Sequence, residues 1–190
     1  MRFASYVLTA IILLAPVQAF AQDWIEYVDR EQRFSVNLPG EPTTEDIMIT
    51  SQRGDTYPAK IYRVSDGVSD YMVKVIDYDG AVVSDVRSSV SWEAWHYRMD
   101  ARDTSGEITF DGYAQIDRIE GHQLQITNTD QSKTYISIHV YNRRLYVLEA
   151  TSPEGLPRPM LFQVSLSMLN EDGQSVRFTI DADGQRISAD

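Results

Sequence analysis

The segment YMVKVIDYDGAVVSDVRSSVSWEAWHYRMDAR, residues 71–102, contains two different hydrophobic periodicities and decides the fold class. Its first part, Tyr71–Tyr78, is a short apolar run that ends at Asp79-Gly80, which is typical of a buried strand followed by a turn. In its second part, apolar residues recur at spacings of three and four, which predicts an amphipathic helix over Ser84–Arg102. The apolar positions of that helix are Val86, Val90, Ala94, Tyr97 and Ala101.

Strand-length segments separated by turn signals fill most of the remaining chain. Phe34–Leu38 alternates apolar and polar residues, so one face of this strand should be buried. Further strands are expected at Trp24–Val28, Glu45–Thr50, Tyr57–Val64, Gly112–Ile119, His122–Thr127, Tyr135–Tyr141 and Leu145–Thr151. Turn signals between them include Asp111-Gly112, Glu120-Gly121 and Asn142-Arg143. Strands that follow one another through such short turns must mostly pair antiparallel.

A second helix is expected over Pro157–Leu169. The prolines at 157 and 159 suit a first helical turn, and two apolar stripes follow at helical spacing, so this helix should be largely buried. The stripes are Leu161, Val164 and Met168, and Phe162, Leu166 and Leu169. We therefore predict an α+β fold with a central antiparallel sheet flanked by two helices, an α/β/α sandwich. Residues 174–190 should add a small terminal hairpin.

The first 21 residues have the pattern of a secretory signal peptide. Arg2 precedes an apolar run over residues 6–17, and small residues ending at Ala21 form a cleavage site. That run is shorter than the roughly 20 residues that a membrane-spanning helix needs. We expect cleavage after Ala21 and a single exported domain over residues 22–190. It should lie in the periplasm of a Gram-negative bacterium, with no membrane span in the mature form.

The chain has no cysteine and a formal net charge of −11. Because disulfides are impossible, stability must come from a hydrophobic core. The acidic balance disfavours nucleic acid as a partner, since phosphate binding needs a basic face. Two interpretations of the charge stay open: it keeps an exported protein in solution, or it serves a cationic partner or a divalent metal.

No motif in the sequence specifies a reaction, a cofactor or a metal. His96, His122 and His139 fall on different expected elements and show no HxH or HExxH spacing. The chain has no GxSxG nucleophile elbow and no phosphate-binding glycine loop. Residues Asp181–Gly184 look like the start of a calcium loop, but a third ligand and the closing glutamate are missing, and Asp-Gly is common in hairpin turns. We therefore predict no catalytic, cofactor or metal residues.

One helix carries a candidate interaction surface. Trp92, Trp95 and Tyr97 lie close together on the helix expected over Ser84–Arg102, beside Arg98. Such a group can form a platform for a sugar or a partner protein. More often, aromatic residues on a helix form the core between that helix and a sheet.

Several stretches resemble one group of exported proteins. They are RFSVNLPGEP at 33–42 after a short strand at 24–29, EGHQL at 120–124, RRLYVL at 143–148, and a closing helix around 162–169. Together they span residues 24–169 and are similar to the PsbP-like small bacterial exported proteins, a group named for an extrinsic subunit of photosystem II. The resemblance implies a central antiparallel sheet sandwiched by helices, used as a docking or accessory module and not as an enzyme. It carries over no functional residue.

Three functions are compatible with the sequence. The favoured one is a non-catalytic periplasmic accessory or binding protein that presents a sheet edge or loop surface to another cell-envelope protein. The second is a hydrolase or other enzyme with a dispersed site, in which a pocket brings His122 or His139 within hydrogen-bond reach of Ser, Asp or Glu. The third is a divalent-metal or small-ligand binder, suggested by the acidic charge and the Asp-Gly turns.

Overall fold

The computed structural model describes residues 24–188, and the predicted signal peptide at residues 1–21 lies outside this part. The elements are β1 (Ile25–Asp29), β2 (Phe34–Leu38), β3 (Thr43–Thr50), β4 (Thr56–Ser65), β5 (Asp70–Asp77), α1 (Val83–Asp103), β6 (Glu107–Ile116), β7 (Ile119–Thr127), β8 (Lys133–Tyr141), β9 (Arg144–Ser152), α2 (Met160–Val164), β10 (Ser167–Met168), β11 (Phe178–Ile180) and β12 (Arg186–Ser188). No helix over residues 24–188 has the length and apolar character needed to cross a membrane.

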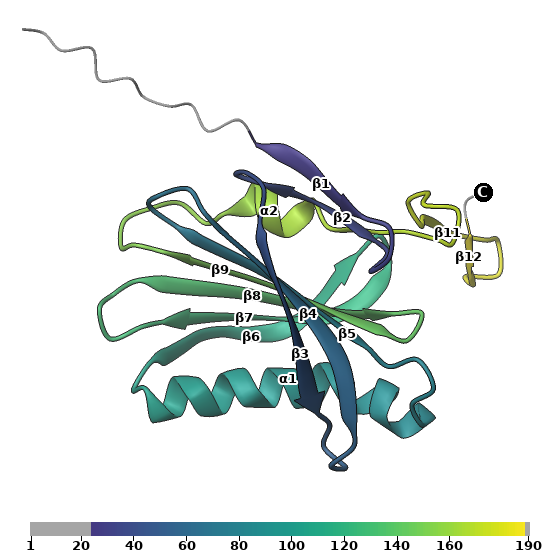
Figure 1. Cartoon of the computed structure of the whole chain (residues 1–190), viewed down its shortest axis with the longest axis horizontal. Helices are drawn as coiled ribbons and strands as arrows, with labels where there is room; N and C mark the ends of the chain where they lie inside the picture. The colour runs from purple at the N-terminus through teal and green to yellow at the C-terminus, as the bar shows by residue number, and fades with distance from the viewer. Residues whose placement is uncertain (1–23, 189–190) are drawn as a thin grey trace, which may run out of the picture.

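Seven strands form one sheet in the order β3-β4-β5-β9-β8-β7-β6 (Figure 1). Every neighbouring pair is antiparallel, which confirms the predicted antiparallel sheet and the α+β class. Strands β8 and β9 are joined by Asn142-Arg143, both with positive φ, as in a tight two-residue hairpin. Helix α1 connects β5 to β6, which lies at the far edge of the sheet. Strands β7, β8 and β9 then follow in order, and β9 pairs with β5.

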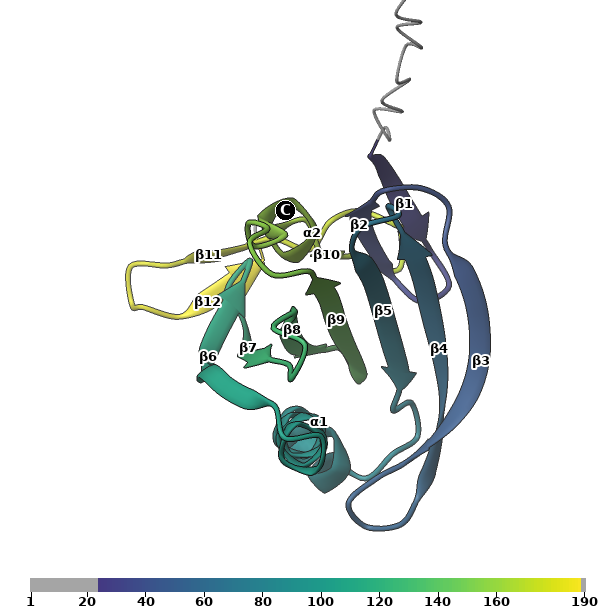
Figure 2. The same ribbon diagram turned by 90° about the vertical axis from the view of Figure 1, so that its left-hand side faces the viewer.

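Helix α1 covers one face of this sheet, beneath β6 to β9 (Figure 2). Ala94 and Ala101 are buried against the strands, in a core shared with Leu124, Ile136 and Val147. The small side chains of α1 let the helix approach the sheet closely. The amphipathic pattern predicted over Ser84–Arg102 therefore has its expected partner.

A smaller sheet covers the other face. It has three strands in the order β1-β2-β10, and its central strand β2 buries Phe34, Val36 and Leu38. These side chains form a second core with residues of β5 and β9, including Val73 and Leu148. The apolar alternation of residues 34–38 thus faces another sheet.

The prediction of one largely buried helix over Pro157–Leu169 is wrong in both length and burial. Only the five residues of α2 are helical, and Ser167–Met168 pairs with β2 as the strand β10. Residues 167–169 are not helical because their backbone N–H and C=O groups bond with β2 and the residue before it. One example is the hydrogen bond from Leu169 N–H to Arg33 O at 2.8 Å. The second layer of the expected sandwich is therefore mainly a small sheet with one short helix.

Two predicted turns are also wrong. Asp111-Gly112 lies inside β6 and Glu120-Gly121 inside β7, while Asp117-Arg118, both at positive φ, joins the two strands. Gly121 is needed for another reason: a Cβ there would collide with the buried His139 ring and a backbone carbonyl of β8. A glycine can mark a close approach between strands as well as a turn.

The edges of the large sheet and the C-terminal residues complete the structure. Among the described strands, β3 pairs only with β4 and β6 only with β7, so each has one free edge. Large apolar side chains are exposed on β6, namely Ile108, Phe110 and Tyr113. Strands β11 and β12 form a separate hairpin, and Phe178 packs edge-on against Tyr141 of β8.

Candidate functional site

A cleft of about 830 Å³ lies between α1 and the part of the sheet formed by β4, β5 and β9. Helix α1 packs mainly on β7 and β8, and the strands β3 to β5 lie to one side of it (Figure 2). Space therefore stays open along this flank of the helix. The volume falls within the range of about 300–1,000 Å³ that is typical of small-molecule sites.

Three side chains of α1 line the cleft, Glu93, Tyr97 and Asp100. Their spacing of four and three residues places them on one face of the helix. Glu93 is buried and forms an ion pair with Lys74 of β5. The Lys74 ammonium also lies 6.0 Å from the centre of the Tyr97 ring. These contacts tie α1 to the sheet at the cleft.

The opposite wall is a row of cross-strand neighbours, Arg63 on β4, Met72 on β5 and Glu149 on β9. The Tyr97 hydroxyl donates a hydrogen bond of 2.6 Å to Oε2 of Glu149. Burial raises the pKa of Tyr97 well above its ordinary value, and the nearby charges of Glu149 and Glu93 raise it further. Tyr97 therefore stays protonated and keeps the Glu149 carboxylate in place.

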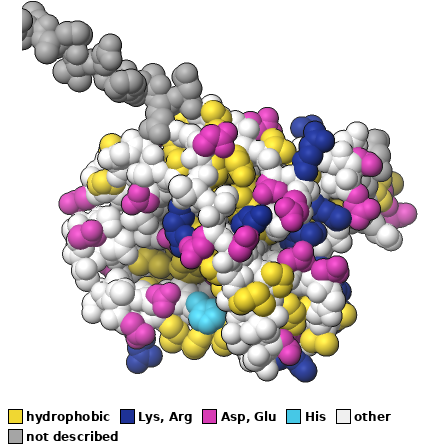
Figure 3. All heavy atoms as spheres, in the orientation of Figure 1, with side chains coloured by type: hydrophobic (Ala, Val, Ile, Leu, Met, Phe, Trp, Pro, Cys, Tyr) yellow, Lys and Arg dark blue, Asp and Glu magenta, His cyan; other side chains and the backbone are white. Residues whose placement is uncertain are grey.

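Carboxylates outnumber cations in this cleft. Its lining includes five acidic residues, Glu41, Asp70, Glu93, Asp100 and Glu149, and two basic ones, Arg63 and Lys74. Both cations are already paired, Lys74 with Glu93 and Arg63 with Glu45. None of the ion pairs found over residues 24–188 involves Asp100 or Glu149. Figure 3 shows that acidic side chains are also spread over a whole face of the molecule.

A second polar cluster lies on another flank of α1. Arg98 donates to both oxygens of Asp111 at 2.6 and 2.9 Å, and His122 Nε2 lies 2.6 Å from Asp111 Oδ1. Hydrogen bonding by Arg98, and to a lesser extent by His122, lowers the pKa of Asp111 to about 2. Because the guanidinium neutralises the carboxylate, the cluster acts as a clamp between α1 and strands β6 and β7.

The two histidines of the enzyme hypothesis occupy different surroundings. His122 contacts a carboxylate, Asp111, but Arg98 shares both the carboxylate and the same ring nitrogen. His139 is buried, and its Nδ1 has no hydrogen-bond partner among the described residues. Burial lowers the pKa of His139 to about 4. Neither histidine lines the cleft.

Three of the four residues of the predicted interaction surface, Trp92, Trp95 and Arg98, line one hollow of about 280 Å³. Trp92 and Trp95 stack with ring centres 5.0 Å apart, and Trp95 is 43% exposed. Tyr97 contacts Glu149 in the cleft, whereas Arg98 binds Asp111. The two tryptophans, with the ring of His96 against them, form an aromatic group at the surface beside Arg98.

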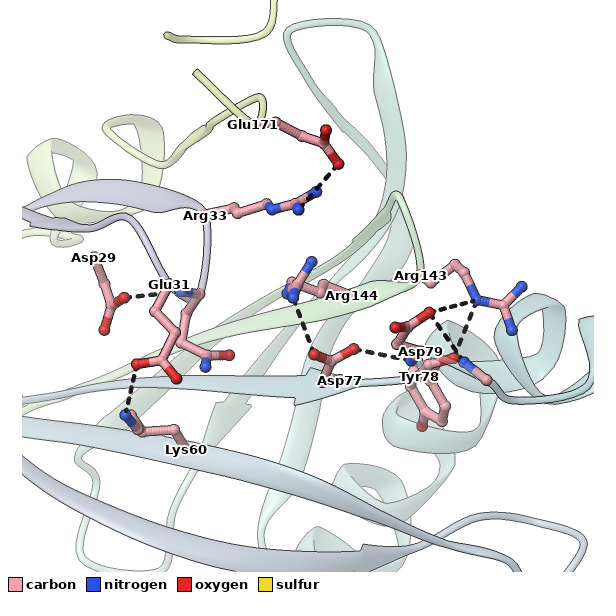
Figure 4. Close-up of polar contacts among 12 residues, drawn as sticks. Asp29, Glu31, Arg33, Lys60, Asp77, Tyr78, Asp79, Arg143, Arg144 and Glu171 are labelled. Atoms are coloured by element: carbon pink, nitrogen blue, oxygen red, sulfur yellow. Dashed lines mark hydrogen bonds and ion pairs between the residues drawn. The ribbon is translucent and has the colours of Figure 1, made fainter. Parts of the chain in front are cut away.

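A third group of polar contacts lies around the β1–β2 turn and around the ends of β5 and β9 (Figure 4). Arg144 lies 3.0 Å from Asp77, and Arg143 donates from Nε to the carbonyl of Tyr78 at 3.2 Å. Further ion pairs here are Lys60–Glu31 at 3.8 Å and Arg33–Glu171 at 3.1 Å. Since each of these cations has an acidic or carbonyl partner, we assign the cluster a structural role in fixing the turns.

Sequence reasoning did not single out Lys74, Glu93 or Glu149. Two of them carried a usable signal, because Lys74 interrupts the apolar run of β5 and Glu149 that of β9. A charge inside an otherwise buried strand has to be paired or has to face a polar space. Which partner it meets depends on how α1 crosses the sheet, and that is a tertiary property.

The fold and the cleft together define an α+β protein with one long antiparallel sheet and a polar hollow under its main helix. No protein-family model matches the chain, and no curated protein matches its sequence. Among solved structures, the chain is similar to the solution structure of cyanobacterial PsbP (CyanoP) from Synechocystis sp. PCC 6803. The two are 12% identical with a TM-score of 0.47, over 75% of this chain and 87% of that chain. A likeness of this degree carries no argument about function.

Proposed function

We propose that this protein is a non-catalytic binding protein of the bacterial cell envelope, whose cleft under α1 holds a small organic cation. The observation that carries the proposal is the cleft itself, with the Asp100 and Glu149 carboxylates on its wall and no cation paired with either among residues 24–188. An organic cation would supply the missing charge. The apolar surface of Met72 and the Tyr97 ring would contact its carbon atoms.

The polar groups of the cleft favour binding over chemistry. A nucleophilic mechanism needs a hydroxyl within reach of a general base. The cleft hydroxyls instead donate to carbonyl or carboxylate oxygens that hold the walls together: Thr43 to Arg63 O, Ser65 to Ser69 O, Tyr71 to Asp66 and Tyr97 to Glu149. No histidine lies among them. The arrangement is therefore suited to a ligand that leaves unchanged.

Charge selectivity and the Glu149→Gln variant test the cleft. The probes are putrescine, spermidine and arginine methyl ester as cations and succinate as an anion, followed by thermal shift and calorimetry. We expect saturable stabilisation by at least one cation and none by succinate, since a ligand that binds only the folded state raises its stability. Glu149→Gln keeps the acceptor for Tyr97 but removes the charge, and should weaken binding roughly tenfold.

The matched control is Glu154→Gln, an identical charge change at an exposed residue outside the cleft. It should leave the dissociation constant within about twofold of the original, because exposed charges are screened over a distance of about 10 Å at 0.1 M salt. Failure of every cation to bind saturably would refute the proposal. Equal weakening by both variants would also refute it, since that result describes a general attraction to a negative protein.

A further inference from the structure

The hollow of about 280 Å³ beside the stacked tryptophans of α1 is a second candidate site. Its lining residues are Gln52, Ser91, Trp92, Trp95 and Arg98, and none of them lines the cleft of the proposed function. Its volume lies just below the range of about 300–1,000 Å³ that is typical of sites for drug-sized molecules. The hollow therefore has room for about one ring of a ligand.

The aromatic side of the hollow is held in place by contacts on several sides. The Trp92 and Trp95 rings are 5.0 Å apart and within 6° of parallel, and His96 packs edge-on against both. Trp92 also donates from Nε1 to the carbonyl of Thr50, the last residue of β3, at 3.4 Å. Trp95 is nevertheless 43% exposed. An aromatic surface that is already ordered and open to solvent can stack on a ligand at little entropic cost.

The turn between β3 and β4 supplies another wall, because it carries Gln52. The next residue, Arg53, lies 3.4 Å from the buried carboxylate of Asp85, near the start of α1. Asp85 also accepts a hydrogen bond from the Tyr57 hydroxyl, which lies just after the turn. Together with the contact between Trp92 and Thr50, these bonds hold the turn against α1 (Figure 1). The hollow is therefore formed before any ligand arrives.

Several polar groups of the hollow have hydrogen-bonding capacity to spare. Neither the Gln52 amide nor the Ser91 hydroxyl is bonded to another residue within 24–188. Arg98 uses Nε and Nη2 to contact Asp111 and His122, while its Nη1 has no protein partner over the same range. An amide, a hydroxyl and a guanidinium nitrogen thus surround the aromatic rings as available donors and acceptors.

The charges around the hollow favour a neutral ligand. No described carboxylate lines it, and Arg98 would repel a cation. An anion gains little, because Asp111 neutralises Arg98 and the whole chain carries a net charge of −11. A hydrocarbon would cover Gln52 and Ser91 without giving them partners, which costs free energy.

We propose that this hollow binds one ring of a neutral pyranose sugar. The apolar C–H face of the sugar would stack on Trp95, and its hydroxyl groups would bond to Gln52, Ser91 and Arg98. This combination of an aromatic surface with neutral donors and acceptors is what a sugar ring requires. The site is separate from the cation cleft, so each of the two proposals can fail without the other.

Titration calorimetry with three neutral oligosaccharides tests the proposal. The probes are cellotetraose, maltotetraose and triacetylchitotriose, added to the chain from Gln22 onward, which contains every described element. We expect saturable binding of at least one of them. Trp95→Ala should weaken that binding about tenfold through loss of the stacking surface. Gln52→Ala should weaken it about threefold through loss of one hydrogen bond.

The matched control is Phe110→Ala, which removes an aromatic ring that is 48% exposed on β6 and outside the hollow. It should leave the dissociation constant within about twofold, because distant substitutions act independently. Circular dichroism verifies that each variant is folded, and Gln52→Ala, in an exposed turn, keeps the test decisive if Trp95→Ala is not.

Three results would overturn the proposal. The first is that none of the three sugars binds saturably to the unaltered chain. The second is equal weakening by Trp95→Ala and Phe110→Ala, which would indicate unspecific contact with exposed rings. The third is sugar binding that Glu149→Gln weakens and Trp95→Ala does not, since the sugar would then occupy the cleft. Cation binding should be unchanged in Trp95→Ala, which separates this test from that of the proposed function.

Discussion

At the scale of single residues, the burial of His139 should make the stability of the protein depend on pH. Its ring lies over Gly121 of the neighbouring strand, where no other residue fits. Burial lowers the pKa of His139 to about 4 and outweighs the opposite influence of the nearby Ile119 and Glu120 backbone. The folded protein therefore holds a neutral ring at pH values where the unfolded chain is protonated.

This difference predicts a loss of stability in mild acid. The pKa of histidine in the unfolded chain is about 6.5, so the unfolded state binds a proton below that pH. In the folded state, His139 binds this proton only when the pH approaches 4. Stability is complete above the unfolded pKa and should fall by about 2 kcal/mol between pH 7 and pH 5. Urea unfolding at the two pH values measures it.

His139→Gln should remove most of that pH dependence, whatever its cost in stability at pH 7. His96→Gln, on the outer face of α1, is the control and should keep the slope that His139 causes. If the His139 variant retained the full loss between pH 7 and pH 5, another group would be responsible and the assignment would fail.

At the scale of elements, α1 is fixed to the sheet by polar contacts at separate points along its length. Near its start, the buried carboxylate of Asp85 accepts the Tyr57 hydroxyl at 2.8 Å and lies 3.4 Å from Arg53. Further along, Arg98 binds Asp111. Apolar packing alone would allow a helix to shift along or rotate on its sheet. Directional contacts of this kind fix one arrangement, and with it the shape of the cleft.

The contact between Arg98 and Asp111 should stabilise the protein in a pH-dependent way. Asp111→Asn should lower the melting temperature by about 2–4 °C at pH 7, corresponding to roughly 1 kcal/mol for a half-exposed pair. Because the pKa of Asp111 is lowered to about 2, the stabilisation is complete above the ordinary aspartate pKa and disappears as the pH falls through about 2. Calorimetry from pH 7 to pH 3 should show a constant difference between the two melting temperatures down to about pH 4 and a smaller difference at pH 3. Parallel curves would contradict this assignment.

At the scale of the whole molecule, the negative charge should make cation binding depend on the salt concentration. The chain carries a formal net charge of −11, which attracts cations to the cleft over long distances. Raising the ionic strength from about 0.02 to 0.2 M should therefore weaken cation binding several-fold. Calorimetry at the two ionic strengths measures the dissociation constant, and a value that does not change with salt would contradict the assignment.

The sequence by itself determined the α+β class and most of the sheet. Alternation over residues 34–38 and the apolar runs of β5 and β9 predicted strands, and the three-to-four spacing predicted α1, because these periods follow from backbone geometry alone. Residues 157–169 show the limit of this reasoning. A helical period says which side chains share a face, but not whether that face meets the core or the solvent.

Only the tertiary structure decided where the chemistry lies. Glu93, Tyr97 and Glu149 are separated by up to 56 residues in the chain, and they line one cleft because α1 lies beside β5 and β9 at one particular position. The same crossing sends Arg98 to Asp111 and leaves Trp95 at the surface. Periodicity fixes each residue's direction on its own element. Which element it meets depends on the packing of the whole core, which local sequence does not encode.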